Sequence, residues 1–295
     1  MNKCQINLNI NMCDLSYTGY KIIKYNIMSI IFDRLGGWGL GNSLFQIATT
    51  ISIANDNNSN YYFPDNCCFI KKYKKYFKKE LPTINTDIYN KIKFERWGVG
   101  IPTKYINPPP LKNAIIDGFF QTEKYFINSR NKIVDAIEIK DEYTIYLKNK
   151  YHDILNEKSC TLHVRRGDYF TAKEMKVIDT EYYKSAIKRF ANDTLFVIFS
   201  DDIEWCKHNL DFITNKIFIN ENNDILELYL MSYFKNNIIA NSTFSWWGAW
   251  LGENNKVIMP NPSNNWFSDF YYKEKELQNI NCEYESIIPN NWIVI

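Results

Sequence analysis

Histidine and the usual metal-binding motifs are nearly absent from this chain. Its 295 residues include only three histidines, and neither a Cys-x-x-Cys pair nor an Asp-x-Asp triplet occurs in it. The seven cysteines are odd in number, so they do not form a complete disulfide framework. We therefore expect no metal and no other cofactor, and we predict reduced thiols in a cytoplasmic compartment.

An excess of one charge is lacking too. Lys plus Arg number 35 and Asp plus Glu number 33, which leaves a formal net charge of +2. A chain so close to neutrality has no general field to hold a polyanion, so we do not expect nucleic acid as a partner. The lysine-rich and aromatic residues 71–79 are the local exception. We interpret them as a solvated helix face, with nucleic-acid binding as the alternative.

Long apolar runs are also missing. Residues 21–32, KIIKYNIMSIIF, come nearest to one, but Lys24 and Asn26 interrupt them. The apolar remainder is far shorter than the about 20 residues that span a bilayer as a helix. We expect no membrane span and no secretion signal.

The chain is long enough for two domains. A length of 295 residues exceeds that of most single domains. Residues 1–26 are polar, Asn-rich and without clear periodicity, and we interpret them as a loosely ordered extension. We place a first domain at residues 27–150 and a second domain at residues 151–295.

The first domain opens with a strand, a glycine loop and a helix. Apolar residues 27–32 predict the strand, and apolar residues at helical spacing follow from position 44. The loop between them contains Gly36, Gly37, Gly39 and Gly41. This spacing does not match G-x-G-x-x-G, which disfavours a dinucleotide cofactor. Residues 57–107 have no regular pattern, and residues 114–117 predict a further short strand.

Strands and helices alternate in the second domain. Short apolar runs that are typical of buried parallel strands occur at residues 160–164, 195–199, 217–219, 238–240 and 257–259. Residues 181–190 predict an amphipathic helix. Asp224 with Glu227 resembles a capping box that opens another helix at residues 225–234. The alternation predicts an α/β fold with a doubly wound parallel sheet.

Three polar loops follow three of these strands. RRGDY begins at residue 165, SDD at residue 200 and NSTFS at residue 241. In open α/β sheets, ligands bind in the crevice beyond the carboxyl ends of the strands. Arginines, paired carboxylates and small hydroxyl groups complement one another there. Together the three loops predict a nucleotide site.

The two adjacent arginines have different expected roles. Planar guanidinium forks hold phosphate oxygens in a way that lysine does not copy. If Arg165 continues the strand, neighbouring residues face opposite sides, so Arg165 shares a side with His163 while Arg166 faces away. We predict that Arg165 binds a phosphate and that Arg166 supports it, paired with Asp168. The alternative is a surface ion pair between Arg166 and Asp168 that serves no ligand.

The other two loops supply acceptors and donors. Asp201 and Asp202 either cap the helix that follows or accept hydrogen bonds from a purine or a ribose hydroxyl. Ser242, Thr243 and Ser245 lie at a predicted helix start, where free backbone N–H groups bind anions. Core packing, rather than ligand stacking, is expected of Trp246, Trp247 and Trp250.

Six motifs of the chain resemble those of one enzyme family. HVRRGDY, FSDDIEWC and NIIANSTFSWWGAWL, in this order, resemble the inverting, GDP-fucose-dependent α-1,2-fucosyltransferases. GGWGLGNSLFQ, GFFQTEKYF and DTEYYKSAI extend the resemblance over roughly residues 27–260. The long third motif is specific, whereas HVRRGDY is shared with α-1,6 and protein O-fucosyltransferases. The resemblance implies two facing Rossmann-like domains, the GT-B arrangement.

The resemblance also implies how the substrates bind. GDP-fucose would be held mainly by the C-terminal domain, without a metal, and the acceptor would enter from the N-terminal side. Arg165 would neutralise the β-phosphate as the bond to fucose breaks, and His163 would lie by the diphosphate or ribose. One of Asp201 and Asp202 would read guanine, and the hydroxyl groups of NSTFS would lie near the phosphates.

The N-terminal motif is expected to face the acceptor. Gly41 and Asn42 would lie on the sugar or acceptor side of the cleft. The glycine loop departs from the family pattern by two additional residues and by Ser43, which stands where the family usually has Gln. Acceptor choice is the property most exposed to these changes.

The implied reaction is a single displacement at the anomeric carbon. The 2-hydroxyl of a galactose residue in a glycan attacks GDP-β-L-fucose and gives an α-1,2 linkage. Asp168 is the candidate general base and Glu174 a second one, although an ion pair with the arginines would make Asp168 a weaker base. The alternatives are a fucosyltransferase of another linkage, such as α-1,6, and a non-catalytic module that binds GDP or a glycan. The sequence predicts neither the acceptor glycan nor the oligomeric state.

Overall fold

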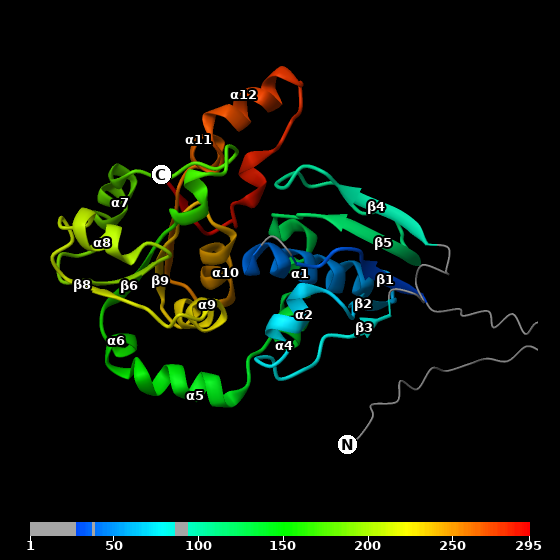
Figure 1. Ribbon diagram of the computed structural model, residues 1–295, viewed down its shortest axis with the longest axis horizontal. Coiled ribbons are helices and arrows are strands. Elements are labelled where there is room, and N and C mark those ends of the chain that lie inside the picture. Colours follow the sequence, from blue (N-terminus) through cyan, green and yellow to red (C-terminus); the bar gives the residue numbers. More distant parts are fainter. Residues whose placement is uncertain (1–27, 37–38, 86–93) are drawn as a thin grey trace, which may run out of the picture.

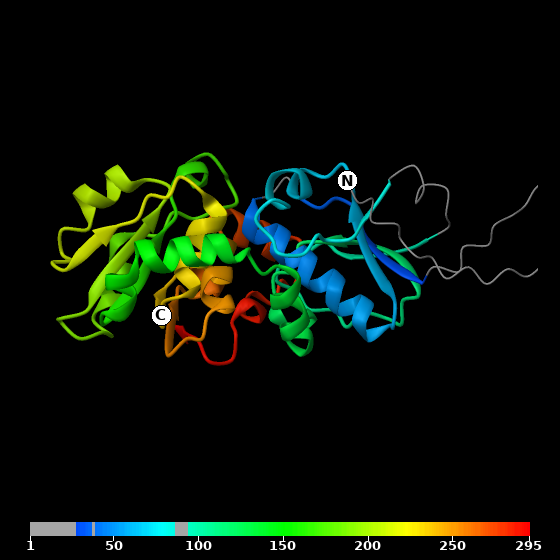
Figure 2. The same cartoon turned by 90° about the horizontal axis from the view of Figure 1, so that it is seen from below.

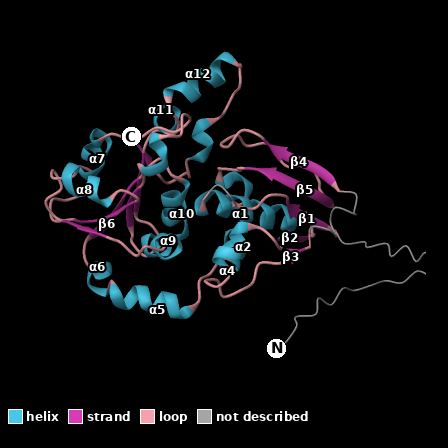
Figure 3. Cartoon of the chain, in the orientation of Figure 1, coloured by secondary structure: helices cyan, strands magenta, loops and turns pink. Residues whose placement is uncertain are grey.

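The computed structural model describes residues 28–36, 39–85 and 94–295. The predicted extension at residues 1–26, the start of the predicted first strand at residue 27, and Gly37 in the glycine loop lie outside the described residues. The described chain forms two lobes that lie side by side, each built on its own sheet (Figures 1 and 3).

The first sheet lies in the N-terminal lobe. Its strand order is β3-β2-β1-β5-β4, and every pair is parallel. The strands are β1 (Ser29–Phe32), β2 (Asn60–Pro64), β3 (Thr83–Ile84), β4 (Glu95–Val99) and β5 (Asn113–Gly118). The strands predicted at residues 27–32 and 114–117 are confirmed as β1 and β5. The expectation that residues 57–107 are irregular is wrong, since they contain β2, β3 and β4.

Helices cover this sheet and connect it to the second lobe. Helix α1 (Leu40–Asp56) packs on β1 and β2, and α4 (Arg130–Ala136) packs on α1. Most of α1 is buried all round, because it lies between its own sheet and a helix of the other lobe (Figure 2). The short α2 (Cys68–Tyr73) carries the start of the lysine-rich stretch, in which lysines face solvent while Tyr73 and Phe77 are buried.

The second sheet lies in the C-terminal lobe, and its strands are again all parallel. Its order is β11-β10-β9-β6-β7-β8. The strands are β6 (Ser159–Val164), β7 (Leu195–Ser200), β8 (Lys216–Phe218), β9 (Asn236–Ile238), β10 (Lys256–Met259) and β11 (Ile293–Val294). The five strands predicted in this half are therefore confirmed, with shifts of up to two residues at their ends.

Helices alternate with these strands as expected. They are α7 (Thr180–Ile187), α8 (Ile203–Asn209), α9 (Asp224–Ser232), α10 (Thr243–Leu251), α11 (Pro262–Asn265) and α12 (Asp269–Leu277). The capping box predicted at Asp224 is wrong by one residue. Asn223 is the N-cap and accepts from the backbone of Leu226, while Asp224 pairs with Lys72 of the other lobe at 2.7 Å.

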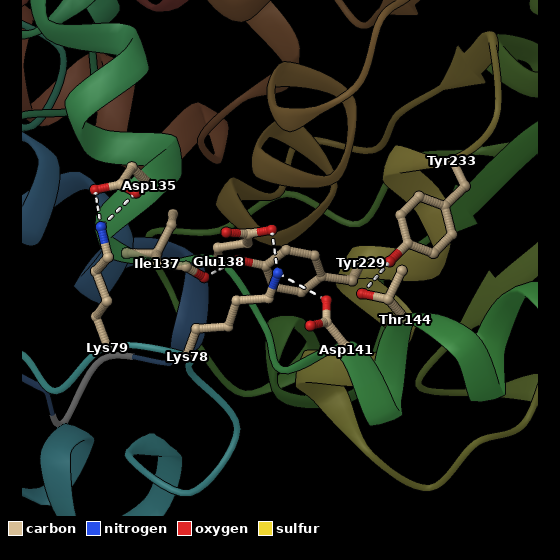
Figure 4. Close-up of polar contacts among 9 residues, drawn as sticks. All are labelled: Lys78, Lys79, Asp135, Ile137, Glu138, Asp141, Thr144, Tyr229 and Tyr233. Atoms are coloured by element: carbon tan, nitrogen blue, oxygen red, sulfur yellow. Dashed lines mark hydrogen bonds and ion pairs between the residues drawn. The ribbon is translucent and has the colours of Figure 1, made fainter.

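The connection between the lobes is held at several points (Figure 4). It runs through α4, α5 (Asp141–Lys150) and α6 (His152–Asn156), so the predicted boundary at residue 150 falls at the end of α5. Lys78 pairs with Glu138 and with Asp141, at 2.7 Å each. On the opposite side, the Tyr229 hydroxyl of α9 donates to the carbonyl of Ile137. The connection therefore contacts both lobes along its length.

Aromatic side chains join the two lobes into one core. Phe45 of α1 packs against Trp246 and Trp247 of α10, with ring centroids 4.5 and 5.2 Å apart. Phe126 stacks on Trp247 at 5.6 Å and meets Trp250 edge-on at 5.4 Å. All five side chains are buried. The prediction that the tryptophans belong to the core is confirmed, and their core is the junction between the lobes.

In the part of the chain that the structure describes, no helix has both the length and the apolar character to cross a bilayer. The five cysteines within that part are free thiols.

Candidate active site

The carboxyl ends of the two sheets face each other across the junction. Helix α1 starts after β1 and α10 starts after β9, so the N-terminus of each helix marks the carboxyl edge of its sheet. These two helix ends are in direct contact. A Cβ atom added to Gly41 would lie 2.4 Å from the carbonyl carbon of Thr243 and 2.5 Å from the backbone nitrogen of Phe244. Gly41 thus permits the close approach of the lobes.

The three polar loops predicted to meet do so. In the second sheet β9, β6 and β7 are neighbours, so the loops that follow them adjoin at one edge. The Tyr169 hydroxyl donates to the carbonyl of Asn241 at 2.9 Å, which ties the first loop to the third. The backbone nitrogen of Arg166 donates to Asp201 at 2.9 Å, which ties the first loop to the second.

Arg165 lies at the centre of this edge. Its Nη2 is 2.7 Å from Asp168 Oδ1 and its Nη1 is 3.2 Å from Asp201 Oδ2, with 30% of the side chain exposed. Its guanidinium lies over the ring of Tyr169, 5.4 Å from the centroid. The buried Nε has no hydrogen-bond partner among the described residues. Two carboxylates and an aromatic ring therefore hold the guanidinium in one position, with part of it accessible.

Arg166 turns to partners different from those of Arg165, and both arginines lie just beyond the end of β6 at Val164. Its Nε is 3.2 Å from Asp202 Oδ2, and only 13% of the side chain is exposed. The guanidinium lies between two rings, with centroids at 3.7 Å for Trp205 and 4.7 Å for Phe170. The expected pair of Arg166 with Asp168 is wrong. Because Arg166 points toward α8, Asp168 pairs with Arg165 instead.

His163 is buried in β6, two residues before Arg165. Burial, together with the nearby positive charge of Arg165, lowers the pKa of His163 from 6.5 to about 3. Its ring lies 5.4 Å from that of Phe244, and within the described chain its buried Nδ1 has no hydrogen-bond partner. The imidazole is therefore neutral near pH 7, with a ring nitrogen that is available to a ligand only if the side chain becomes accessible.

The two aspartates of the second loop differ in their contacts. Asp202 caps α8 by accepting from the backbone of Trp205 at 3.1 Å, which confirms the capping interpretation for this residue. Asp201 lies between Arg165 and the backbone of Arg166. A Cβ atom at Gly167 would lie 2.7 Å from Asp201 Oδ2, so the glycine of RRGD makes room for this carboxylate. Recognition of guanine by either aspartate stays a prediction.

The third loop presents a helix start. Ser242 is the N-cap of α10, but its side chain makes no capping hydrogen bond to a described residue. The first N–H groups of α10 therefore have no side-chain partner from the N-cap residue, and the backbone of Gly41 packs against them. Ser245 is fully buried and its hydroxyl donates to the carbonyl of Ser242 at 3.3 Å. Thr243 is half-buried and lies against Gly41. Contact of these hydroxyl groups with phosphate stays a prediction.

The N-terminal lobe contributes amide groups that sequence reasoning missed. Gln121 Nε2 donates to Asn42 Oδ1 at 2.9 Å, and Gln46 Nε2 donates to the carbonyl of Gly118 at 3.2 Å. Both glutamines belong to motifs named in the sequence analysis. Their contacts could not be predicted there because each hydrogen bond joins residues more than 70 positions apart in the sequence. Ser43 is buried and its hydroxyl donates to the carbonyl of Gly39 at 3.0 Å, which closes the glycine loop.

The described residues include no group of three or more His, Cys, Asp or Glu side chains placed to hold a metal ion. The charged centre of the site consists of guanidinium groups and the carboxylates that position them.

Comparison with known sequences gives consistent matches. The model of the family described as glycosyl transferase family 11 matches residues 71–286. An α-1,2-colitosyltransferase of Escherichia coli is 34% identical over 265 residues, covering 76% of this chain and 88% of the relative. A galactoside 2-α-L-fucosyltransferase of Caenorhabditis elegans is 23% identical, covering 87% of this chain and 78% of the relative.

Solved structures confirm the fold. The fucosyltransferase NodZ from Bradyrhizobium superposes with a TM-score of 0.54 at 14% identity, covering 81% of this chain and 96% of NodZ. A glycosyl transferase family 9 structure from Veillonella parvula superposes with a TM-score of 0.51 at 11% identity, covering 90% of this chain and 94% of the other. The expected pair of facing Rossmann-like domains in the GT-B arrangement is confirmed.

Proposed function

The chain belongs to glycosyl transferase family 11, and on this premise we propose that it transfers L-fucose from GDP-β-L-fucose to the 2-hydroxyl of a galactose residue. The bond that forms joins the galactose O2 to the fucose anomeric carbon, and the bond that breaks joins this carbon to the β-phosphate oxygen. Attack from the opposite side inverts the configuration and gives an α-1,2 linkage. The relatives named as α-1,2-transferases and the GDP-fucose soaked into NodZ support this assignment.

The observation that carries the proposal is the placement of Arg165. A part-exposed guanidinium at the carboxyl edge of the second sheet, in a loop that is tied to the loop before α10, is a fixed positive charge for a departing diphosphate. Such preorganised charge stabilises the transition state without a reorganisation cost at the moment of reaction. We infer that the charge of the leaving GDP is met in this way and that no metal is needed.

The remaining site residues have supporting roles in this proposal. Arg166, locked between Trp205 and Phe170, orients Asp201 through its backbone and Asp202 through its side chain. One of these two carboxylates accepts hydrogen bonds from guanine. The galactose hydroxyl loses its proton to a general base, for which Asp168 is the candidate because its carboxylate belongs to the site and is 64% exposed.

A second candidate donor is favoured by the E. coli relative. That protein is named for colitose, the sugar that differs from L-fucose in lacking the 3-hydroxyl. The same arginine would serve GDP-colitose equally well, because both donors release GDP. A direct comparison of GDP-fucose with GDP-colitose, with GDP-mannose and UDP-galactose as negative controls, decides between them.

The decisive test of the proposal removes the Arg165 guanidinium. Arg165→Ala should lower kcat at saturating GDP-fucose about a hundredfold, the loss of about 3 kcal/mol expected for one well-placed charge donor. Arg189→Ala, an exposed arginine at the end of α7, is the matched control and should retain full activity. Near-normal turnover of Arg165→Ala would overturn the assignment, as would loss of activity after chelation of divalent metals. NMR of the product distinguishes the α-1,2 from an α-1,6 linkage.

A further inference from the structure

A cavity of about 580 Å³ opens on the N-terminal lobe beside the site. It lies where β1, β4 and β5 end, against the second turn of α1, and we call it the β4–β5 groove. The residues that matter to its chemistry are Arg34, Gln46, Arg96, Trp97, Asp117 and Phe119. All of its lining comes from the N-terminal lobe, between residues 34 and 119.

Two ion pairs make the mouth of the groove polar and neutral. Arg34 Nη2 is 2.7 Å from Asp117 Oδ2, and Arg96 Nη1 is 3.0 Å from Asp33 Oδ2. Both arginine side chains are well exposed, at 77% and 67%. Each pair offers guanidinium donors next to carboxylate acceptors, with no net charge. This combination suits a ligand with several hydroxyl groups, each of which both donates and accepts.

The interior of the groove combines an aromatic wall with an unused acceptor. Trp97 lines the groove and stacks on the buried ring of Phe120 at 5.7 Å with an interplanar angle of 17°, so its position is fixed. Gln46 is only 4% exposed, and its Oε1 has no hydrogen-bond partner in the described part of the chain. Buried amide oxygens are normally paired, so an unpaired one in a cavity wall points to a missing ligand group.

We propose that the β4–β5 groove is the subsite for the sugar that follows the reacting galactose in the acceptor, and that it selects an uncharged sugar. This inference rests on the proposed function. The ring of the sugar packs on Trp97 and its outer hydroxyl groups bind the two ion pairs. A rotation of the Gln46 side chain, whose Oε1 is buried, would let one hydroxyl or amide N–H group of the sugar donate to that oxygen.

The reacting galactose itself does not fit this position. It must contact the donor, which binds to the second sheet, whereas the second sheet contributes nothing to the groove. The contact of Gly41 with Thr243 places the junction of the lobes at the first turn of α1, and Gln46 lies more than a turn farther along that helix. The groove therefore extends the site away from the donor, in the direction in which a glycan chain continues.

The test compares a one-sugar with a two-sugar acceptor. Wild-type protein should use N-acetyllactosamine at least about tenfold more efficiently, in kcat/KM, than methyl β-D-galactoside, which cannot reach the groove. Arg96→Ala and Arg34→Ala should each remove most of this advantage, because a lost charge-assisted hydrogen bond is worth about tenfold. The rate with methyl β-D-galactoside and the KM for GDP-fucose should not change.

The matched control is Lys132→Ala. Lys132 lines a separate cavity of about 410 Å³ on the N-terminal lobe, bounded by the end of α1 and by α4, and its loss should leave the two-sugar advantage intact. Asp117→Asn adds a test of charge selection. This variant leaves Arg34 without its carboxylate partner. The kcat/KM for an acceptor with glucuronic acid in the second position should therefore rise relative to that for N-acetyllactosamine.

Each outcome decides the inference. A two-sugar advantage that survives in both arginine variants, or that is absent from the wild type, overturns it. If the wild type transfers no sugar to any acceptor, the proposed function fails, and saturation-transfer NMR with N-acetyllactosamine and GDP decides the groove separately. Binding that is lost in Arg96→Ala but kept in Lys132→Ala would then support the groove, and absence of binding would overturn it.

Discussion

Replacing Gly41 by alanine tests whether the contact between the two helix starts sets the geometry of the site. The added methyl group would lie 2.4 Å from the carbonyl carbon of Thr243 and 2.6 Å from its oxygen. Ordinary van der Waals contact begins at 3.4 Å. Both neighbours are backbone atoms, so no side-chain rotation relieves the overlap. The lobes must separate locally by about 1 Å for the alanine to fit.

The consequences for activity and stability differ in size. A displacement of about 1 Å between the reacting groups costs about a hundredfold in rate. Overpacking of a tight contact costs about 1–3 kcal/mol of stability. The aromatic cluster of Phe45, Trp246 and Trp247 adjoins this contact and continues to hold the lobes together. We therefore expect a folded protein with a lower Tm and a much lower kcat.

The assay is transfer of fucose at saturating donor and acceptor, with thermal unfolding of the same preparations. The double variant Gly41→Ala/Thr243→Ala separates backbone from side-chain crowding. Because the clash is with backbone atoms, the second change should not restore the activity lost in the first, relative to Thr243→Ala alone. Wild-type kcat and Tm in Gly41→Ala, or rescue by Thr243→Ala, would refute the reasoning.

Two further predictions concern residues around Arg165. Burial lowers the pKa of His163 from 6.5 in the unfolded state to about 3 in the folded state. Between these values the unfolded state binds more protons, so the free energy of unfolding falls as the pH drops from 6.5 toward 3. His163→Asn should make the free energy of unfolding, measured in urea at several pH values, depend less on pH. Asp168→Asn should leave GDP binding unchanged or tighten it by up to about fivefold by calorimetry, because an exposed pair worth about 0–1 kcal/mol no longer competes for Arg165. Asp153→Asn, 96% exposed on α6, is its control, and weaker GDP binding by Asp168→Asn alone would contradict the prediction.

The sequence predicted the second sheet better than the first, for a physical reason. Strands β6 and β7 are buried on both faces, so they read as continuous apolar runs. Strand β4, ERWGV, is an edge strand with three exposed residues out of five, and β2 ends in proline. Such strands exist because β1 and β5 pair with them, not because their own residues favour a strand. A local pattern does not contain that information.

The site, like the fold, was only partly predictable from the sequence. That the three loops meet could be predicted, because strand order in a parallel sheet brings the carboxyl ends together. Which carboxylate pairs with which arginine could not be predicted, since three aspartates lie in the two adjoining loops and the conformation of the turn decides the pairing. The amides of Gln46 and Gln121 were missed because their partners are remote in sequence.

The conformation of the turn after β6 gives the two adjacent arginines different roles. Just beyond the end of β6, Arg165 pairs with Asp168 and Asp201, whereas Arg166 turns toward α8, where two aromatic rings and Asp202 fix it. Gly167 then leaves room for Asp201, which accepts from the backbone of Arg166 and from the side chain of Arg165. Arg166, the less exposed of the two, therefore positions Arg165 through a shared carboxylate. A lysine at either position lacks the planar fork that this arrangement requires, so Arg-to-Lys exchange is not conservative here.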